Sequence, residues 1–331
     1  MLNFNSEQLE REHQNGVDII PQVETAIDDV CAKGYSNIFY VGIGGTVLYA
    51  NQMAIIAKHA GSTLPIFVEN AADFCLTGNP HFSSKSIVVI ESISGDTKEV
   101  VEAVKVAKAK GAKVIGYVEK EGTPLAEMSN YLITTVGGGY YFWYSVTLRF
   151  MKNANQFPQY DKFMSEIKCL PKNAVEIQKT VDAKAKAFAQ KYKDEPLHYI
   201  VGSGNLEDWA TCYGMCILEE MQWIKTRPIS ASNFFHGTLE VVERDSSVIL
   251  IKGEDCTRPL MERVEKFVNT ICANVTVFDS KDFELEGISE EFRGMVCPIV
   301  MRCAFQRISA HLEHERRHPL AIRRYYRRLD Y

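Results

Sequence analysis

The chain has 331 residues, 46% of them hydrophobic, so it is long enough for about two domains with full cores and is not a disordered protein. Its net charge of −5, with both signs interspersed, gives no support for nucleic acid as a main partner. The nine cysteines include no CxxC pair and no His/Cys cluster, which argues against a disulfide framework and a metal site. No signal pattern and no apolar run of membrane-spanning length is found, so we expect a soluble, cytoplasmic protein without a membrane partner.

The first half of the sequence alternates short apolar strands with helices. One helix is predicted for residues 5–34, ending at Gly34, and an aromatic-rich helix for residues 140–152. Between them, the alternation of strand and helix favours a parallel sheet covered by helices on both faces. The predicted strands are residues 37–41, 65–68, 86–90, 113–118 and 131–135, and the predicted helices are residues 47–59, 97–110 and 124–128, with a turn or short helix at 71–74.

The same order of elements restarts in the second half. A strand at residues 198–201 runs into a glycine turn, as does the strand at residues 37–41. The segment SVILIKGEDCTR, residues 247–258, takes the place of SIVVIESISGDT, residues 86–97. We therefore expect two tandem copies of one α/β unit. The expected boundaries are residues 1–155 for the first unit, 156–195 for a connecting segment with a long polar helix at 173–192, and 196–331 for the second unit with an Arg/Tyr-rich tail.

A turn rich in hydroxyl groups follows the strand at residues 86–90. Ser92, Ser94, Gly95 and Thr97 lie in this turn, just before a predicted helix. The first N–H groups of a helix have no intrahelical partner and the helix dipole is positive there, so the turn suits a phosphate. A Ser/Thr-capped turn is the alternative, although three hydroxyl groups exceed what capping requires. The turn is not a Walker loop, because no lysine directly follows its glycine.

The corresponding turn of the second copy has different chemistry. Gly253 and Asp255 stand there in place of two of the serines. A carboxylate repels a phosphate, so we infer one anion site per chain, in the first copy. A dinucleotide site at GIGGTV, with Glu69 as the ribose ligand, is a further alternative. It is disfavoured because Val47 stands where the third spaced glycine is needed, and no cofactor is expected.

Two titratable residues of the second copy are candidates for proton transfer. Glu220 lies in CILEEMQW, which is predicted as a mostly apolar helix, and His236 lies in SNFFHGTLE, between aromatic residues and a glycine. A carboxylate in apolar surroundings suits proton abstraction near neutral pH, and such a histidine suits proton transfer to a ring oxygen. The alternatives are a glutamate on a helix surface and a core histidine bonded to a backbone carbonyl.

These motifs resemble those of a known family. SISGDT, with GIGGT upstream, is similar to the phosphate loop of sugar isomerase (SIS) domain proteins, which also contain tandem α/β units. EEMQW followed by FFHGTLE resembles a second signature of the family, with the same 16-residue spacing from Glu220 to His236. Within the family, the chain most resembles the fructosamine-6-phosphate deglycases, such as fructoselysine-6-phosphate deglycase. They share MQWI, TRPLMER at residues 257–263 and an ending like HPLAIRRYYRRLDY.

The resemblance implies roles for individual residues. Glu220 would be the general base or acid, and His236 would open the sugar ring or shuttle a proton. The histidine would come from a neighbouring subunit, in a homodimer or larger homo-oligomer with shared active sites. We further expect, from the chemistry of arginine, that the arginine-rich tail closes over the site or holds a carboxylate of the substrate. The implied phosphate ligands are Thr46, Ser92, Ser94 and Thr97, with backbone contributions from Gly44, Gly45 and Gly95 and tail contacts from Arg323, Arg324 and Tyr325.

The chain departs from its relatives at Ser232–Asn233, where Gly-Glu is common, so it lacks a second carboxylate there. Its last lysine is Lys281, and the arginines of the tail form no Schiff base. An Amadori substrate brings its own nitrogen, so no lysine is needed. The resemblance therefore implies a deglycase that converts a fructosamine 6-phosphate to glucose 6-phosphate and a free amino acid. The alternatives are an aldose–ketose phosphosugar isomerase and a non-catalytic sugar-phosphate sensor, although residues 1–35 lack the basic recognition helix of a DNA-binding sensor.

Overall fold

The computed structural model describes residues 1–330, so Tyr331 at the end of the tail lies outside the described residues. The chain forms two compact units. Glu7–Pro171 is the N-terminal unit, and Met1–Ser6 together with the chain from Lys172 onward is the C-terminal unit. Among the described residues, no helix combines the length and the apolar character that crossing a membrane requires.

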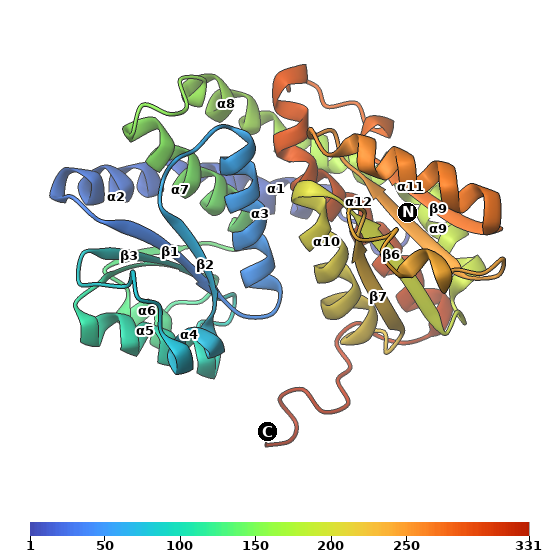
Figure 1. Cartoon of the computed structure of the whole chain (residues 1–331), viewed down its shortest axis with the longest axis horizontal. Helices are drawn as coiled ribbons and strands as arrows, with labels where there is room; N and C mark the ends of the chain where they lie inside the picture. The colour runs from blue at the N-terminus through green and yellow to red at the C-terminus, as the bar shows by residue number, and fades with distance from the viewer. Residues whose placement is uncertain (331) are drawn as a thin grey trace. The chain divides into compact units, whose positions relative to one another are not determined.

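The N-terminal unit is built around a five-stranded parallel sheet (Figure 1). Its strands are β1 (Asn37–Gly42), β2 (Ile66–Asn70), β3 (Ser86–Glu91), β4 (Lys113–Val118) and β5 (Tyr131–Thr134). They lie in the order β2-β1-β3-β4-β5, and β1 and β3 are buried along their whole length. Strands covered on both faces are apolar without alternation, which is why continuous apolar runs predicted them.

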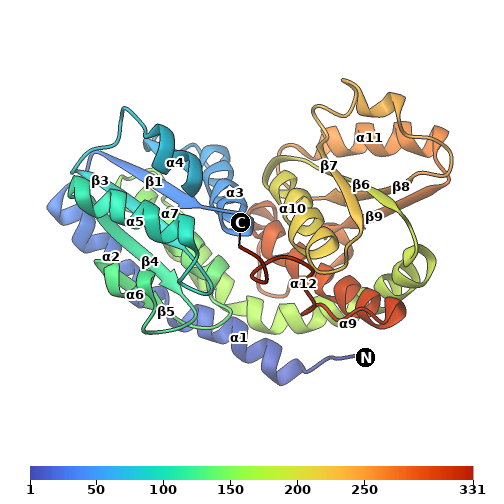
Figure 2. The same ribbon diagram turned by 90° about the horizontal axis from the view of Figure 1, so that it is seen from below.

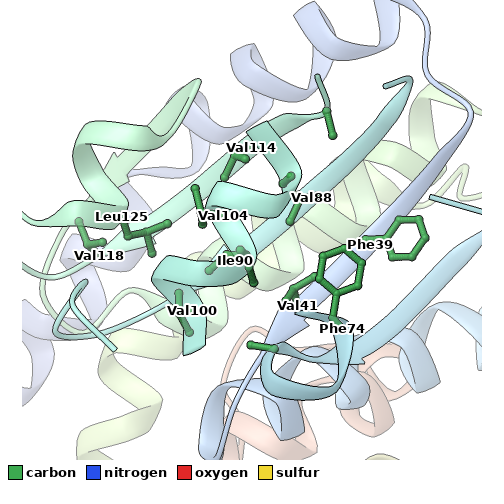
Figure 3. Close-up of a cluster of buried hydrophobic side chains, with 14 of the residues drawn as sticks. Phe39, Val41, Phe74, Val88, Ile90, Val100, Val104, Val114, Val118 and Leu125 are labelled. Atoms are coloured by element: carbon green, nitrogen blue, oxygen red, sulfur yellow. The ribbon is translucent and has the colours of Figure 1, made fainter. Parts of the chain in front are cut away.

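Helices cover both faces of this sheet. They are α1 (Ser6–Asp18), α2 (Ile20–Lys33), α3 (Gly45–His59), α4 (Ala71–Thr77), α5 (Lys98–Lys110), α6 (Pro124–Met128), α7 (Gly139–Asn153) and α8 (Tyr160–Glu166), followed by a 3₁₀ turn, η1 (Ile167–Cys169). Apolar residues of α4, α5 and α6 pack on one face, against Phe39, Val88 and Val114 (Figure 3). Successive residues of a strand point to opposite faces of the sheet, so the other face also needs a cover. Helix α7 covers it together with α2 and α3, which it contacts.

The single helix predicted for residues 5–34 is wrong, because the segment forms two helices that meet at Ile19. Pro21 lies in the first turn of α2, and its nitrogen has no hydrogen to donate, so the residue starts a helix and cannot continue one. The predicted end at Gly34 is confirmed by its φ of 77°, which glycine adopts without steric cost. The other predicted helices and strands are observed with ends that differ by at most three residues.

The C-terminal unit repeats this architecture with four parallel strands in the order β7-β6-β8-β9. The strands are β6 (Leu197–Gly202), β7 (Lys225–Ser230), β8 (Ser247–Lys252) and β9 (Asn274–Asp279). The α-helices are α9 (Leu170–Tyr192), α10 (Glu207–Cys212), α11 (Arg258–Ile271) and α12 (Glu290–Arg316). The shorter segments are a π-helix, η3 (Tyr213–Glu219), and 3₁₀ turns η2 (Gly204–Leu206), η4 (Thr238–Glu240) and η5 (Ser280–Asp282).

Helices also lie on both faces of the second sheet. Met261, Val264 and Val268 of α11 pack against one face, and Figure 2 shows α9 on the other. Two parallel sheets, each flanked by helices, confirm the predicted α/β fold class. In both units, the loops that follow the parallel strands gather at one edge of the sheet, and this edge carries most of the candidate site residues.

Candidate active site

Two loops of the N-terminal unit meet at the carboxyl edge of its sheet. Strands β1 and β3 are parallel neighbours, so the loops that follow them start side by side. Strand β2 lies on the far side of β1, which means that the order of strands reverses between β1 and β3. Open α/β sheets bind their ligands outside the strand ends at such a reversal. The structure therefore brings together the two segments predicted to bind phosphate, residues 44–46 and 92–97.

In the loop between β3 and α5, the three hydroxyl groups are not equivalent. Ser92 is 4% exposed, and its Oγ accepts a hydrogen bond from the N–H of Gly95 (3.1 Å), so it shapes the loop. The Oγ of Ser94 donates to Oδ1 of Asp96 (2.5 Å). Thr97 stands at the N-cap of α5, yet its hydroxyl makes no cap hydrogen bond. The capped-turn alternative is therefore wrong for Thr97, and its half-buried hydroxyl is available to a ligand.

The backbone of this loop depends on Gly95. Its φ is 68°, in the left-handed region that favours glycine. A Cβ at this position would overlap the hydroxyl of Thr123, next to α6. The carbonyl of Gly95 also accepts a hydrogen bond from the N–H of Leu125 in α6 (3.0 Å). Helix α6 thus holds the loop closely, which fixes the start of α5 and its N–H groups.

The loop between β1 and α3 is a tighter glycine turn. Gly44 has φ 60° and ψ −130°, which only glycine adopts readily, and open space surrounds the position of a Cβ. The hydroxyl of Thr46 donates to the carbonyl of Ile43 (3.1 Å) and accepts from the backbone N–H of Ile43 (3.2 Å). Thr46 therefore stabilises the turn. Gly45 begins α3, so this loop offers an anion the N–H groups of a first helical turn.

In the C-terminal unit, an internal carboxylate bridges the corresponding loops after β6 and β8. Oδ2 of Asp255 accepts from the N–H of Asn205 (3.1 Å), and Oδ1 accepts from the N–H (2.9 Å) and hydroxyl (2.5 Å) of Thr257. Asp255 makes the contacts that a bound anion would make between these loops. Its negative charge and its filled hydrogen bonds disfavour a phosphate in this unit.

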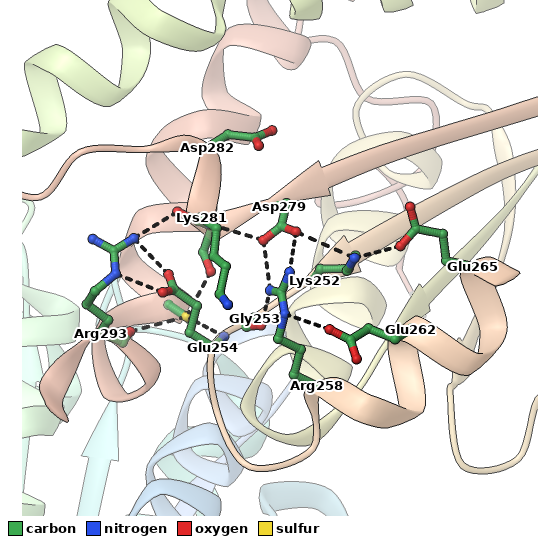
Figure 4. Close-up of polar contacts among 12 residues, drawn as sticks. Lys252, Gly253, Glu254, Arg258, Glu262, Glu265, Asp279, Lys281, Asp282 and Arg293 are labelled. Atoms are coloured by element: carbon green, nitrogen blue, oxygen red, sulfur yellow. Dashed lines mark hydrogen bonds and ion pairs between the residues drawn. The ribbon is translucent and has the colours of Figure 1, made fainter. Parts of the chain in front are cut away.

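Ion pairs connect the loops at the carboxyl edge of the second sheet (Figure 4). The guanidinium of Arg293 donates to both oxygens of Glu254 (2.7 and 2.9 Å), and that of Arg258 donates to both oxygens of Asp279 (2.9 and 2.6 Å). Burial raises the pKa of Asp279, but the hydrogen bond from Arg258 and further partners outweigh it and lower the pKa overall. Paired charges of this kind rigidify the loops around Asp255, so this edge of the second sheet has a structural role.

Glu220 lies directly after the π-helix η3, and its N–H donates to the carbonyl of Met215 (3.0 Å). Glu220 is therefore the residue that ends this helix and does not lie inside it, and its surroundings are not apolar as predicted, because its side chain is 31% exposed beside an open cavity of about 270 Å³. Short π-helical segments are rare and are often found at functional sites. The neighbouring Glu219 has another role, because its Oε1 accepts from the N–H (3.1 Å) and hydroxyl (2.6 Å) of Thr226.

The C-terminal tail folds back onto the turn that carries Glu220, within the same unit. Nε of Arg323 donates to Oε1 of Glu220 (2.7 Å). The guanidinium of Arg324 lies 4.1 Å from the ring centroid of Trp223. Trp223 has a φ of 57°, which is unusual for a bulky residue, and it is 37% exposed. Sequence reasoning missed Trp223, although an isolated Trp next to the predicted glutamate was the available signal. Tyr325 and Tyr326 also line the cavity.

His236 and Glu220 belong to the same unit but lie at opposite ends of strand β7. It is exposed, in a turn that follows β7, and its N–H donates to the carbonyl of Asn233 (2.9 Å). Glu220 precedes β7, whose six residues extend about 20 Å. The structure therefore does not bring the two predicted catalytic residues together within the C-terminal unit. Among residues 1–330, no group of three His, Cys, Asp or Glu side chains is arranged to hold a metal ion.

Comparisons with known proteins agree with this architecture. Residues 33–152 match the SIS domain. Fructosamine deglycase FrlB of Bacillus subtilis is 28% identical over 321 residues, which cover 94% of this chain and 97% of the relative. Fructoselysine 6-phosphate deglycase of Escherichia coli O157:H7 is 24% identical over 315 residues, with 93% and 90% coverage.

A solved structure of a candidate phosphosugar isomerase from Bacillus subtilis has a TM-score of 0.90 to this chain. The two are 26% identical, and the match covers 96% of this chain and 99% of the other. A second candidate phosphosugar isomerase, from Salmonella typhimurium, has a TM-score of 0.86 and 28% identity, with 97% and 99% coverage. The chain therefore carries a SIS domain at residues 33–152 and is similar along almost its whole length to fructosamine and fructoselysine 6-phosphate deglycases.

Proposed function

We propose that this protein is a phosphosugar deglycase, which cleaves a fructosamine 6-phosphate to glucose 6-phosphate and a free amino acid. Similarity over more than nine-tenths of the chain to deglycases supports this class of enzyme. The observation that carries the proposal is the cavity beside Glu220, lined by arginine and aromatic side chains. A deglycase must hold an amino acid next to the group that moves the proton, whereas a plain sugar isomerase has no such need.

The phosphate of the substrate binds the loop from Ser92 to Thr97. The hydroxyl of Thr97 and the N–H groups at the start of α5 are the donors, and the N–H groups at the start of α3 add to them. Ser92 and Thr46 act mainly by shaping their loops, because their hydroxyls already bond to neighbouring backbone. Ser94 is the remaining hydroxyl of the loop and is half-buried.

The chemical steps require one base and one acid. After the ring opens, Glu220 takes a proton from C1 while His236 gives one to the carbonyl oxygen on C2, which forms an enolamine. Glu220 then returns its proton to C2, and the nitrogen passes its proton back to His236. The product is an aldose imine, and water adds to C1 to release the amine and leave the aldehyde of glucose 6-phosphate. His236 comes from a second copy of the chain, in a homo-oligomer of at least two.

The proposal is tested with a panel of phosphorylated Amadori and Heyns compounds and with fructose 6-phosphate. Release of free amino acid and of glucose 6-phosphate in equal amounts is the expected result. Interconversion of fructose 6-phosphate and glucose 6-phosphate without amine release from any adduct would establish the isomerase instead. Binding of sugar phosphates with no turnover of any compound would establish the sensor.

A further inference from the structure

The cavity beside Glu220 contains two arginines with different partners. The guanidinium of Arg323 is paired with Glu220 at 2.7 Å. That of Arg324 lies against the ring of Trp223, and within the described part of the chain it pairs with no carboxylate. The other acid of the cavity wall, Glu219, is bonded to Thr226. Arg324 therefore presents an uncompensated positive charge to this cavity.

Stacking prepares this guanidinium for an anionic ligand. A guanidinium that lies on an aromatic ring keeps its N–H donors at its edge, where they can bind both oxygens of one carboxylate. The contact also restrains a flexible side chain before the ligand arrives, which lowers the entropy lost on binding. Trp223 is itself held in place, since its N–H donates to the carbonyl of Glu219 (3.1 Å) and the next N–H, of Ile224, donates to Leu218 (2.8 Å).

The size of the cavity limits what it can hold. Pockets that enclose a whole small-molecule ligand usually measure 300–1,000 Å³. A volume of about 270 Å³ fits one end of a substrate, and the tyrosine rings of Tyr325 and Tyr326 add apolar wall. An amino acid fits both the size and the charge. The neighbouring carboxylates of Glu219 and Glu220 repel a doubly charged phosphate more strongly than a singly charged carboxylate, so the cavity favours the carboxylate.

We propose that this cavity binds the carboxylate of the amino acid that the reaction releases, with Arg324 as its bidentate partner and Trp223 as the support of that arginine. This inference rests on the proposed function and assigns to it the residues that select for an amine with a carboxylate. The preferred substrates are adducts of amines that carry a carboxylate, and adducts of simple alkylamines are poor substrates. The amine end is thereby placed beside Glu220, whose proton transfer acts on the adjacent carbon.

A matched pair of substrates tests the subsite. One is the 6-phosphorylated fructosamine of phenylalanine, and the other is that of phenethylamine, which lacks only the carboxylate. For amine release by the wild-type protein, kcat/KM is expected to be about ten- to a hundredfold higher for the first compound. This ratio corresponds to the free energy that one charge-assisted hydrogen bond contributes. In Arg324→Gln this ratio falls to near one. In Arg328→Gln, an exposed arginine of the same tail outside the cavity, the ratio stays as in wild type.

The failures of the two proposals are distinguishable. If the wild-type protein releases both amines equally well, the deglycase stands and the carboxylate subsite is wrong. If it releases neither, the same pair is titrated against the protein by calorimetry, and the deglycase is wrong if no compound of the panel releases its amine. Tighter binding of the phenylalanine adduct, lost in Arg324→Gln, still supports the subsite, and equal binding overturns it. Circular dichroism of both variants shows whether they fold like the wild type.

Discussion

Glu220 precedes strand β7 and His236 follows it, so the two residues flank this strand from opposite ends. Six residues of extended chain separate their two turns by about 20 Å. Proton transfer requires each group to come within hydrogen-bond distance of the reacting atoms, which are neighbours in the sugar. Glu220 and His236 of one chain are therefore too far apart in this conformation to reach the reacting atoms of the same sugar. We propose that two copies of the chain each provide one of these residues to a shared site.

Complementation between two inactive variants tests the shared site. Glu220→Gln and His236→Gln are each expected to lose turnover by about 10²- to 10⁴-fold, the usual contribution of general acid–base catalysis. When the two variants are mixed, dissociated and reassembled, half of the dimers carry one chain of each kind. One site in each mixed dimer then has both native residues, so about a quarter of the wild-type activity returns.

The control for this experiment is each variant taken alone through the same dissociation and reassembly. A mixture that stays as inactive as its components, while mixed oligomers are demonstrated by mass spectrometry, would show that Glu220 and His236 act within one chain or not at all.

Thr97 is expected to contribute directly to phosphate binding. Its hydroxyl makes no cap hydrogen bond in the structure, so Thr97→Val removes a ligand donor with little cost to the helix. Loss of one charge-assisted hydrogen bond raises KM for the phosphorylated substrate about tenfold, with kcat nearly retained. Thr25→Val is the matched control, because Thr25 lies on the exposed face of α2 and its hydroxyl donates to the carbonyl of Pro21. An equal effect of Thr97→Val on the unphosphorylated fructosamine would contradict the assignment.

Gly95 is expected to be irreplaceable in the phosphate loop. In Gly95→Ala, a positive φ of 68° costs about 1–2 kcal/mol, and the new Cβ overlaps the hydroxyl of Thr123, which adds a packing cost of about 1–3 kcal/mol. The variant should unfold at lower urea concentration and bind the sugar phosphate weakly. Gly61→Ala separates the two costs, because Gly61 has a φ of 82° with open space around its Cβ. Equal losses in the two variants would rule out the contact with Thr123.

Buried His198 is expected to make the stability of the protein depend on pH. Its side chain is fully buried on β6, where its Nδ1 lies 2.8 Å from Oγ of Ser247, and burial, assisted by Arg316, lowers its pKa from 6.5 to about 4. Between these values the unfolded chain binds a proton that the folded protein does not, so stability present above pH 6.5 is lost as the pH falls. The shift corresponds to a loss on the order of 3 kcal/mol in the free energy of unfolding.

Urea unfolding at several pH values between 7 and 4 measures this dependence. His198→Gln, which does not titrate, should flatten the profile in this range, while His59→Gln at the exposed end of α3 should leave it unchanged. The lowered pKa values of Asp182 and Asp279 act only below their ordinary value of 3.8, outside this window. A profile for His198→Gln that is parallel to the wild type would show that His198 is not the source.

Most of the fold could be predicted from local patterns in the sequence. Runs such as Ile87–Ile90 are apolar because both faces of their strands are covered, and Gly111 ends a helix because its φ is positive. The break at Ile19 was not predicted, although Pro21 is a signal for the start of a second helix. The π-helix before Glu220 was not predictable either, because the wider turn of a π-helix leaves no mark in the hydrophobic periodicity.

The sequence alone determined the strands, the glycine and hydroxyl turns after them, and the absence of a matching hydroxyl turn in the second copy. These features depend on residues that are close together in the chain, so their chemistry can be inferred from short segments. Tertiary structure alone decided that Arg323 pairs with Glu220, 103 residues earlier, and that Arg324 lies on Trp223. It also decided that Asp255 bridges two loops. Such contacts join distant segments, and their geometry depends on how the whole unit packs, which no local pattern encodes.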